Sequence, residues 1–191
     1  MRPCSLWLLL ARPPRLHQLN ALGRLQKLAV QLKATLEGLT DLKPIGDNFN
    51  WLFKVRCSGC REEHPNWMGI DATETRDISG SRGEANLVWR CQLCKKESNV
   101  SFDDSFKRSS ASYTAEDSEE QRFATLAVLE CRGCELTEFD PKGVWSAKGA
   151  ESGTVFDEVE ISKDEPEWSD YDEKAGAGVS IMEVETRISR A

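Results

Sequence analysis

FKVRCSGCRE (residues 53–62) and VWRCQLCKK (residues 88–96) each place a Cys-x-x-Cys pair directly after an apolar, strand-like run. A two-residue spacer lets both sulfurs of one turn face a single tetrahedral ion at about 2.3 Å, and two such turns supply four thiolates. Small or polar spacer residues help each turn to close. The pattern therefore predicts a zinc site with four ligands: Cys57, Cys60, Cys91 and Cys94.

The spacing also indicates what kind of zinc site this is. Thirty residues separate the two pairs, more than the 15 to 20 of a compact zinc ribbon, so we expect a hairpin or small sheet between them. Four cysteines fill the tetrahedron and leave no open position for water, which a catalytic zinc requires. We therefore expect one structural zinc ion and no catalytic residue. His64 follows Cys60 closely, but the four sulfurs already satisfy the ion.

A third pair, Cys131 and Cys134 in LECRGCEL (residues 129–136), follows another apolar run. Six thiolates exceed what one zinc ion takes. The pair could be two packed thiols, since buried free cysteine behaves as a small hydrophobic residue. It could also be a redox-labile disulfide, or a partial metal site completed by another protein. A thiol-disulfide or other cysteine-dependent redox enzyme that uses this pair is the first alternative function.

The remaining pattern favours a mainly β fold. Several segments have strand length and are rich in β-branched or aromatic residues, and Gly, Pro, Asp and Asn turns separate them. We expect antiparallel sheets in two β-rich halves that share a core and join near the zinc site. The segment 25–39 has leucines at helical steps as well, and a helix there is the minority interpretation. The segments expected as strands are 28–39, 50–57, 85–91, 97–102, 122–131, 154–161 and 179–188.

Composition divides the chain into an extension and a domain. Residues 1–27 contain five basic residues and no acidic one, which is typical either of a mitochondrial presequence or of a disordered extension without function. Residues 28–191 form the predicted zinc-binding domain. The polar, acidic stretch 107–122 is predicted to be a loop or linker between possible halves 28–106 and 123–191, which at about 70 residues would be marginal alone.

From Leu28 onward the chain resembles the eukaryotic CXXC motif containing zinc binding protein family. The resemblance implies an intracellular, soluble, mostly β protein that binds one structural zinc through the four cysteines of the two turns, without established enzymatic activity. It does not extend to residues 1–27, and Cys134 is not general in the family, so no second zinc site is implied. The segments that carry the resemblance are LAVQLKATLEGLTDL (28–42), KVRCSGC (54–60), SRGEANLVWRCQLC (81–94), LECRGCEL (129–136), AKGAESGT (147–154) and WSDYDEK (168–174).

Charge bears on the choice of partner. The chain has a net charge of −7, and residues 28–191 carry 20 basic and 32 acidic residues, a net of −12. Such a domain repels phosphates unless a local basic patch overcomes the repulsion, so we expect no nucleic-acid partner. A zinc-ribbon-like nucleic-acid binder remains the second alternative function, because basic residues cluster near the two cysteine turns: Arg56, Arg61, Arg82, Arg90, Lys95 and Lys96.

Cysteine usage and hydropathy bear on location and role. Seven cysteines in metal-type spacing without a convincing secretory signal indicate a reducing compartment. We expect the cytoplasm, with the nucleus as a second location and mitochondrial targeting by residues 1–27 as an alternative. The apolar run at residues 6–11 is too short to span a bilayer. The sequence predicts a monomeric, non-enzymatic module for protein interaction or metal homeostasis, with unidentified protein partners.

Overall fold

Antiparallel strands make up most of the computed structural model, which describes residues 25–191. The expectations of a presequence or a disordered extension fall on residues that are mostly outside this range. Gln26 and Lys27, which the sequence placed in the extension, belong to the first strand, β1 (Gln26–Glu37). Within residues 25–191, no helix has the length and apolar character needed to cross a membrane.

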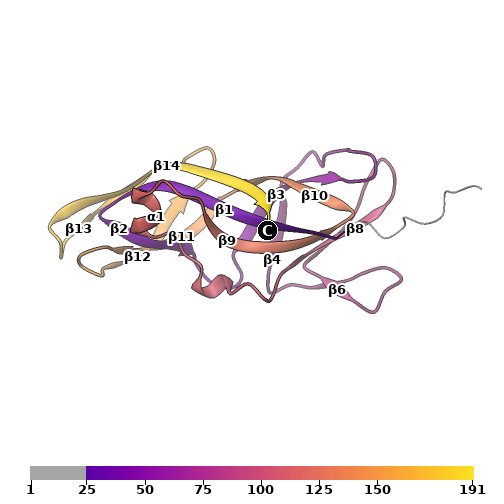
Figure 1. Ribbon diagram of the computed structural model, residues 1–191, viewed down its shortest axis with the longest axis horizontal. Coiled ribbons are helices and arrows are strands. Elements are labelled where there is room, and N and C mark those ends of the chain that lie inside the picture. Colours follow the sequence, from indigo (N-terminus) through magenta and orange to yellow (C-terminus); the bar gives the residue numbers. More distant parts are fainter. Residues whose placement is uncertain (1–24) are drawn as a thin grey trace, which may run out of the picture.

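The largest sheet has six strands in the order β13-β14-β1-β9-β8-β7, all antiparallel. Its strands come from both of the halves expected from the sequence, and β1, β9 and β14 run along the long axis of the molecule (Figure 1). The strands of this sheet are β1, β7 (Leu87–Arg90), β8 (Glu97–Phe102), β9 (Ala124–Arg132), β13 (Trp168–Asp172) and β14 (Ala177–Arg190).

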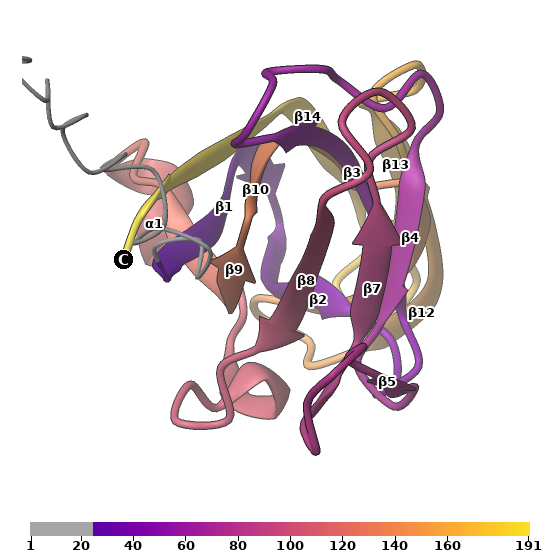
Figure 2. The ribbon, with the colours of Figure 1, turned by 90° about the vertical axis from the view of Figure 1, so that its right-hand side faces the viewer.

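Two three-stranded sheets and one small hairpin complete the fold. One sheet has the order β10-β3-β4, the other has the order β12-β11-β2, and β5 pairs with β6. Seen end-on, the strands lie around a common interior (Figure 2). The strands are β2 (Leu39–Pro44), β3 (Asn50–Cys57), β4 (Met68–Asp71), β5 (Arg76–Asp77), β6 (Glu84–Ala85), β10 (Cys134–Asp140), β11 (Gly143–Gly149) and β12 (Val155–Ile161).

The interior is one continuous cluster of buried side chains that takes members from the large sheet and from both three-stranded sheets. Strand β3 shows how the sequence builds it, because Trp51, Phe53, Val55 and Cys57 alternate with more exposed residues and all point inward. This period of two is the pattern of a strand with one buried face. The same alternation brings Cys57, at the end of β3, to the edge of the core.

The segment 25–39, where a helix was the minority interpretation, forms β1 and the start of β2. Gly38, with a φ of 66°, makes the turn between these two strands. Strand β1 pairs with β14 on one side and β9 on the other. An interior position in a sheet satisfies both edges of the backbone, which explains why tertiary pairing prevails over the helical leucine spacing.

The acidic stretch 107–122 contains two short helices, η1 (Arg108–Ser110) and α1 (Ala115–Glu119). It is attached to the sheets at several points. Tyr113 is fully buried and its hydroxyl donates to the carbonyl of Ala34 at 2.9 Å. The hydroxyl of Ser118 accepts from the backbone N–H of Leu36 at 2.8 Å. The stretch therefore packs on β1 and β2, which its polar composition did not indicate.

Candidate metal centre

The two Cys-x-x-Cys turns have the same backbone geometry. In the first turn, the N–H of Cys57 donates to a carbonyl five residues later at 2.8 Å, and its carbonyl accepts from the N–H of Arg61 at 2.9 Å. In the second turn, the N–H of Cys91 likewise donates to the carbonyl of Lys96 at 2.9 Å, and the carbonyl of Cys91 accepts from the N–H of Lys95 at 3.0 Å. In each turn, the fourth residue after the first cysteine has a left-handed backbone conformation, with a φ of 67° at Arg61 and 60° at Lys95. Two matched turns thus follow β3 and β7.

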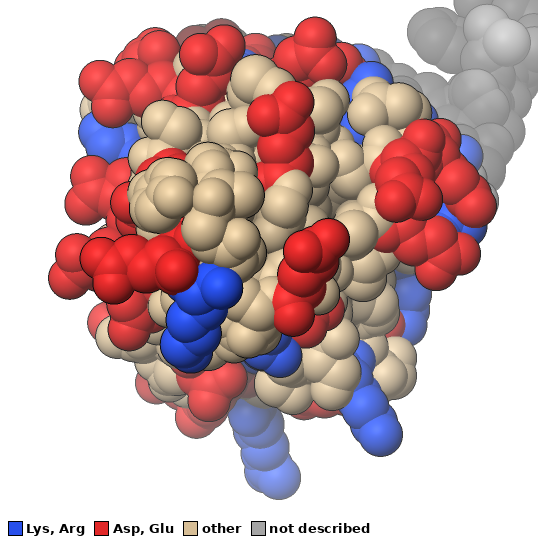
Figure 3. Space-filling model, turned by 90° about the vertical axis from the view of Figure 1, so that its left-hand side faces the viewer, with Lys and Arg blue, Asp and Glu red and all other residues tan. Residues whose placement is uncertain are grey.

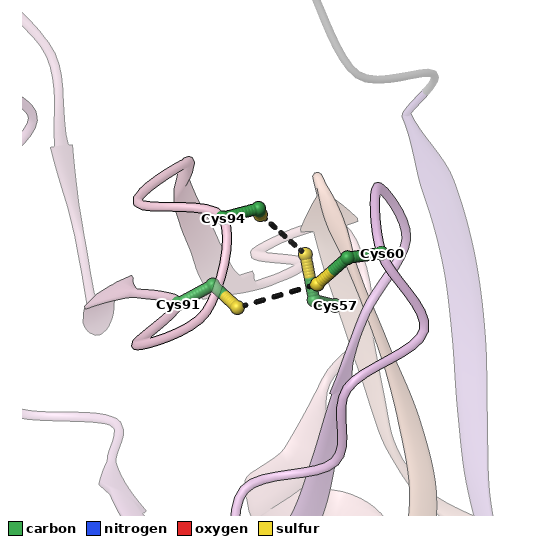
Figure 4. Close-up of side chains that lie close together, drawn as sticks. All are labelled: Cys57, Cys60, Cys91 and Cys94. Carbon is green, nitrogen blue, oxygen red and sulfur yellow. Dashed lines mark hydrogen bonds between the residues drawn. The ribbon is translucent and has the colours of Figure 1, made fainter.

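The four sulfurs of these turns converge on one point. Cys57 and Cys60 come from one turn, Cys91 and Cys94 come from the other, and the side chains face one another (Figure 4). The Cys57 and Cys94 sulfurs are 3.6 Å apart, the Cys60 and Cys91 sulfurs are 3.5 Å apart, and all four lie within 4.8 Å of one another. Four sulfurs at 2.3 Å from a tetrahedral zinc ion are about 3.8 Å apart. The donor set therefore fits zinc in number, chemistry and spacing.

One sulfur from each turn has a shifted pKa. The N–H of Cys94 donates toward the sulfur of Cys91 and lowers the pKa of that thiol to about 7. The N–H of Glu62 acts in the same direction on Cys60, but burial and the neighbouring sulfurs outweigh it and raise the pKa of Cys60 to about 12. Four sulfurs this close cannot all ionise without a cation between them, because like charges disfavour one another. A divalent metal ion supplies that cation and displaces the protons.

The third cysteine pair lies behind the first turn and outside the sulfur cluster. Cys131 and Cys134 have exposed fractions of 0 % and 2 %, and both are free thiols. Cys134 is the register partner of Cys57 between β10 and β3. The adjacent Cys134 sulfur and burial raise the pKa of Cys131 well above its usual range. Within residues 25–191 the one group with metal-ligand spacing contains only the four cysteines of the two turns.

The spacer of the third pair has its own contact with the metal centre. The carbonyl of Gly133 accepts a hydrogen bond from the N–H of Ser58, within the first turn, at 3.0 Å. Gly133 has a φ of 79°, and a Cβ atom there would lie 2.9 Å from the hydroxyl of Ser98 and 3.3 Å from the carbonyl of Glu97. Position 133 therefore favours glycine for its conformation and for the space around it. The sequence showed the glycine but not the turn that it supports.

Half of the basic residues near the turns are paired with acidic side chains. Arg56 and Arg61 both contact the carboxylate of Glu135, at 2.8 and 2.9 Å, and Arg90 contacts Glu97 at 3.3 Å. These two glutamates were not singled out from the sequence. Glu135 is far from Arg56 and Arg61 along the chain, and the strand register that places Glu97 opposite Arg90 is not evident from the sequence. Three of the six basic residues form no ion pair within residues 25–191: Arg82, Lys95 and Lys96.

His64 lies outside the sulfur cluster, as the sequence predicted. Its Nδ1 is 2.9 Å from the carbonyl of Asn66, and its ring lies edge-on to Trp89 with centroids 6.0 Å apart. The segment SGSRGE (79–84) forms the turn between β5 and β6, with the N–H of Ile78 donating to the carbonyl of Gly83 at 3.0 Å. Neither feature contributes a ligand.

Two segments of the sequence resemblance, AKGAESGT and WSDYDEK, meet away from the metal centre. Asp172 is 1 % exposed and accepts from the hydroxyls of Ser152 and Thr154 and from the N–H groups of Lys174 and Ala175. The Ser152 hydroxyl and these further donors hold the pKa of Asp172 below its usual range. Every donor is part of the two hairpin ends themselves, so the arrangement joins the β11–β12 turn to the β13–β14 turn.

The comparisons with known proteins cover nearly all of the described chain. A family model described as "CXXC motif containing zinc binding protein, eukaryotic" matches residues 29–189. A UPF0587 protein of Schizosaccharomyces pombe is 46 % identical over 166 residues, which are 86 % of this chain and 99 % of the relative. The CXXC motif containing zinc binding protein of Homo sapiens is 40 % identical over 158 residues, which are 83 % of this chain and 94 % of that protein.

Two solved structures have a similar fold. The structure titled "Crystal Structure of C1orf123" superposes with a TM-score of 0.76 and is 38 % identical, covering 86 % of this chain and 99 % of that one. A hypothetical protein from Plasmodium falciparum has a TM-score of 0.74 and 26 % identity at the same coverage. The sequence resemblance and the fold similarity thus agree over the same part of the chain.

Proposed function

Because the chain belongs to the eukaryotic family of CXXC motif containing zinc binding proteins, we propose that it binds a single zinc ion through Cys57, Cys60, Cys91 and Cys94. The observation that carries the proposal is the convergence of the four sulfurs within 4.8 Å. In this proposal the ion has four protein ligands and no position for water or substrate, so its role is structural.

The location of the four cysteines supports a structural role. Cys57 ends β3, which lies in the β10-β3-β4 sheet, whereas Cys91 and Cys94 lie between β7 and β8 at the edge of the six-stranded sheet. A zinc ion here connects two sheets that share no backbone ladder. Its binding free energy contributes to folding, on the order of 10 kcal/mol at neutral pH. Loss of the ion is then expected to loosen this end of the molecule.

We further propose a non-enzymatic role in protein interaction or metal homeostasis. Leu93, at the tip of the second turn, is 65 % exposed, and Lys95 and Lys96 beside it have no acidic partner within the described chain. In this proposal, Leu93, Lys95 and Lys96 are the side chains of the second turn that a protein partner contacts. We propose that the protein is a monomer and that it works in the cytoplasm or nucleus, where thiolates remain reduced.

The two alternative functions have less support. For nucleic-acid binding, half of the six candidate basic residues are paired with glutamates. The end of the molecule that carries β12 and β13 also displays many acidic side chains (Figure 3). For a thiol enzyme, a nucleophilic cysteine must be accessible and ionised, whereas Cys131 and Cys134 are buried. Neither alternative has an observation that favours it over the structural zinc site.

The test is the zinc content of the full chain, measured by native mass spectrometry with elemental analysis. We expect one zinc ion per chain, and one zinc ion in the double variant Cys131→Ala, Cys134→Ala. Cys57→Ser and Cys91→Ser should lose the ion or hold it weakly, because each removes one of four thiolates.

Three results would contradict the proposal. Two zinc ions in the parent and one in the Cys131→Ala, Cys134→Ala variant would make the third pair a metal site. Full retention of zinc by Cys57→Ser together with an unchanged melting temperature would show that this sulfur is not a ligand. Rapid removal of zinc by a chelator without any loss of structure would favour metal transfer over a structural role.

A further inference from the structure

A cavity of about 280 Å³ lies away from the metal centre, where β2 and the loop after it approach β9, β11 and η1. No residue of the two cysteine turns lines it. Its residues come from five parts of the chain, which are β2 with the loop after it, β3, η1, β9 and β11, so the cavity depends on the folded arrangement of the sheets. We call it the Lys43/Arg108 cavity, after the two basic residues that line it.

One wall of the cavity is apolar and rigid. Trp51 and Leu126 line it and are 4 % and 1 % exposed, so their positions are fixed by the core. Trp51 lies against the rings of Phe49, Phe102 and Phe139, with centroids 5.3 to 5.9 Å apart. Because so little of the Trp51 and Leu126 side chains is exposed, they form a narrow apolar floor, and Ile45, which is 37 % exposed, supplies the accessible apolar surface of the lining.

The two basic residues lack acidic partners. Lys43 and Arg108 are each half-buried, and neither forms an ion pair with any residue between 25 and 191. The guanidinium of Arg108 lies over the ring of Phe102, 4.2 Å from its centroid, which fixes its position without neutralising its charge. Asp47, the one acidic residue lining the cavity, is exposed and forms no ion pair in the same part of the chain.

Hydroxyl groups complete the polar side. Ser146 is the register partner of Lys43 between β11 and β2, and Ser109 is adjacent to Arg108. Both line the cavity. Partly desolvated cations without a counterion are costly, and in a chain of net charge −7 acidic partners are plentiful elsewhere. Two such cations beside two hydroxyls and the exposed Ile45 have the composition of a binding site for an anion with an apolar body.

We infer that the Lys43/Arg108 cavity binds a small molecule that combines an apolar group with a phosphate or carboxylate. The apolar group lies against Ile45 and the small exposed part of Trp51, and the anionic group contacts Lys43 and Arg108. The guanidinium can donate two parallel hydrogen bonds to either kind of anion. The volume of about 280 Å³ is just below the range of about 300 to 1,000 Å³ that is usual for ligand sites, so the ligand is no larger than one ring system with its anionic substituent.

The experiment uses phenyl phosphate as the probe and the zinc-loaded full chain, observed by ¹H–¹⁵N NMR. We expect saturable shift changes at the indole N–H of Trp51 and at the backbone N–H groups of Ser109 and Ser146. Benzyl alcohol, which has the ring without the charge, and inorganic phosphate, which has the charge without the ring, should each bind more weakly. Benzoate in place of phenyl phosphate distinguishes a carboxylate site from a phosphate site.

Variants then test the two cations separately. Lys43→Gln and Arg108→Gln should each weaken phenyl phosphate binding by ~tenfold or more, the usual size for a charged hydrogen bond. Lys107→Gln is the matched control, because Lys107 is exposed, adjacent to Arg108 and outside the cavity. It should change the affinity little. Lys43→Gln keeps the test valid if loss of the Arg108–Phe102 contact disturbs folding, since the Lys43 ammonium has no ion-pair partner within residues 25–191.

Three outcomes would overturn the inference. The first is an absence of saturable shifts at the cavity residues. The second is equal affinity for benzyl alcohol and phenyl phosphate, which would make the site apolar only. The third is an equal loss of phenyl phosphate affinity in Lys107→Gln and Lys43→Gln, which would mean that general surface charge, and not the cavity, accounts for the binding. Since none of these variants alters a proposed zinc ligand, the result is independent of the zinc content.

Discussion

At the scale of single residues, Asp172 shows how a buried carboxylate can fix a turn without any part in the metal centre. It accepts four hydrogen bonds from hydroxyl and backbone donors of two hairpin ends. Gly149 allows this close packing, because a Cβ atom there would collide with the Asp172 carboxylate and the Ser152 hydroxyl. The segment WSDYDEK (168–174) forms strand β13 up to Asp172 and then the first residues of the turn that Asp172 holds.

This carboxylate leads to a prediction of pH dependence. The Ser152 hydroxyl and the other donors lower the folded-state pKa of Asp172. A lowered pKa stabilises the folded state above the unfolded pKa of about 3.9, and the contribution disappears as pH falls through the folded value. We therefore expect Asp172→Asn to lower the denaturation midpoint at pH 7, and the gap between variant and parent to narrow below about pH 4.

The measurement is urea unfolding at a series of pH values. Asp170→Asn is the matched control, because Asp170 is an exposed acid of the same strand, and within residues 25–191 its side chain accepts a hydrogen bond only from the N–H of Tyr171. The denaturation midpoint of Asp170→Asn should lie close to that of the parent at every pH. If the difference in denaturation midpoint between Asp172→Asn and the parent became larger on acidification, the lowered pKa of Asp172 would not account for it.

At the scale of elements, the two cysteine turns and the β9–β10 connection form one unit. Gly133 joins the connection to the first turn through the hydrogen bond from Ser58, and Cys134 lies opposite Cys57 in the β10–β3 ladder. The third Cys-x-x-Cys pair therefore supports the first turn by packing. The third pair thus resembles the other two pairs in sequence but lies outside the four-sulfur cluster.

Gly133→Ala tests this unit. Alanine at a φ of 79° is strained by about 1 to 2 kcal/mol, and its Cβ would be too close to Ser98 and Glu97. We expect a loss of roughly 2 kcal/mol or more in unfolding free energy, together with weaker zinc retention against a chelator. Both can be measured by urea unfolding and by chelator competition.

Gly80→Ala supplies the control for backbone strain alone. Gly80 has a φ of 72°, and nothing lies within 4 Å of its added Cβ. We expect it to cost about 1 to 2 kcal/mol without any change in zinc retention. If Gly133→Ala behaves like Gly80→Ala in both measurements, the contact with the first turn has no influence on the metal centre.

The elements also show what the sequence could and could not predict. The mainly β class and the four-cysteine cluster are confirmed, because strand alternation and the Cys-x-x-Cys spacing are both local patterns. The packing of residues 107–122 was not predicted, since Tyr113 and Ser118 stand alone in a polar stretch and their partners in β1 are about 80 residues away. The pairing of β1 with both β9 and β14 was equally hidden, because single-sequence patterns carry no register information over such distances.

At the scale of the whole molecule, the proposed zinc ion and the hydrophobic core stabilise different parts. Long strands β1, β9 and β14 run along the molecule (Figure 1), and the buried cluster links them to the smaller sheets. The four cysteines connect the end of β3 to the β7–β8 turn, where sheet pairing is short. Strand β7 has only four residues, so this corner depends most on the ion.

Removal of zinc should therefore act locally before it acts globally. We expect a chelator to expose the amides of residues around the two cysteine turns and of β7 to hydrogen exchange first, because the proposed ion lies between these turns and β7 pairs with β8 over only four residues. The central pairing of β1 with β9 and β14 should remain protected longer. Hydrogen exchange followed by mass spectrometry measures both. Uniform loss of protection over the whole chain would contradict a local role.

The most direct test of the zinc site is X-ray absorption at the zinc K-edge on the full, zinc-loaded chain. A closed site made by Cys57, Cys60, Cys91 and Cys94 predicts four sulfur scatterers at about 2.3 Å and no nitrogen or oxygen in the first coordination shell. Three or fewer sulfurs with an added nitrogen or oxygen neighbour would contradict it, because the ion would then have an open position or a ligand other than these four cysteines.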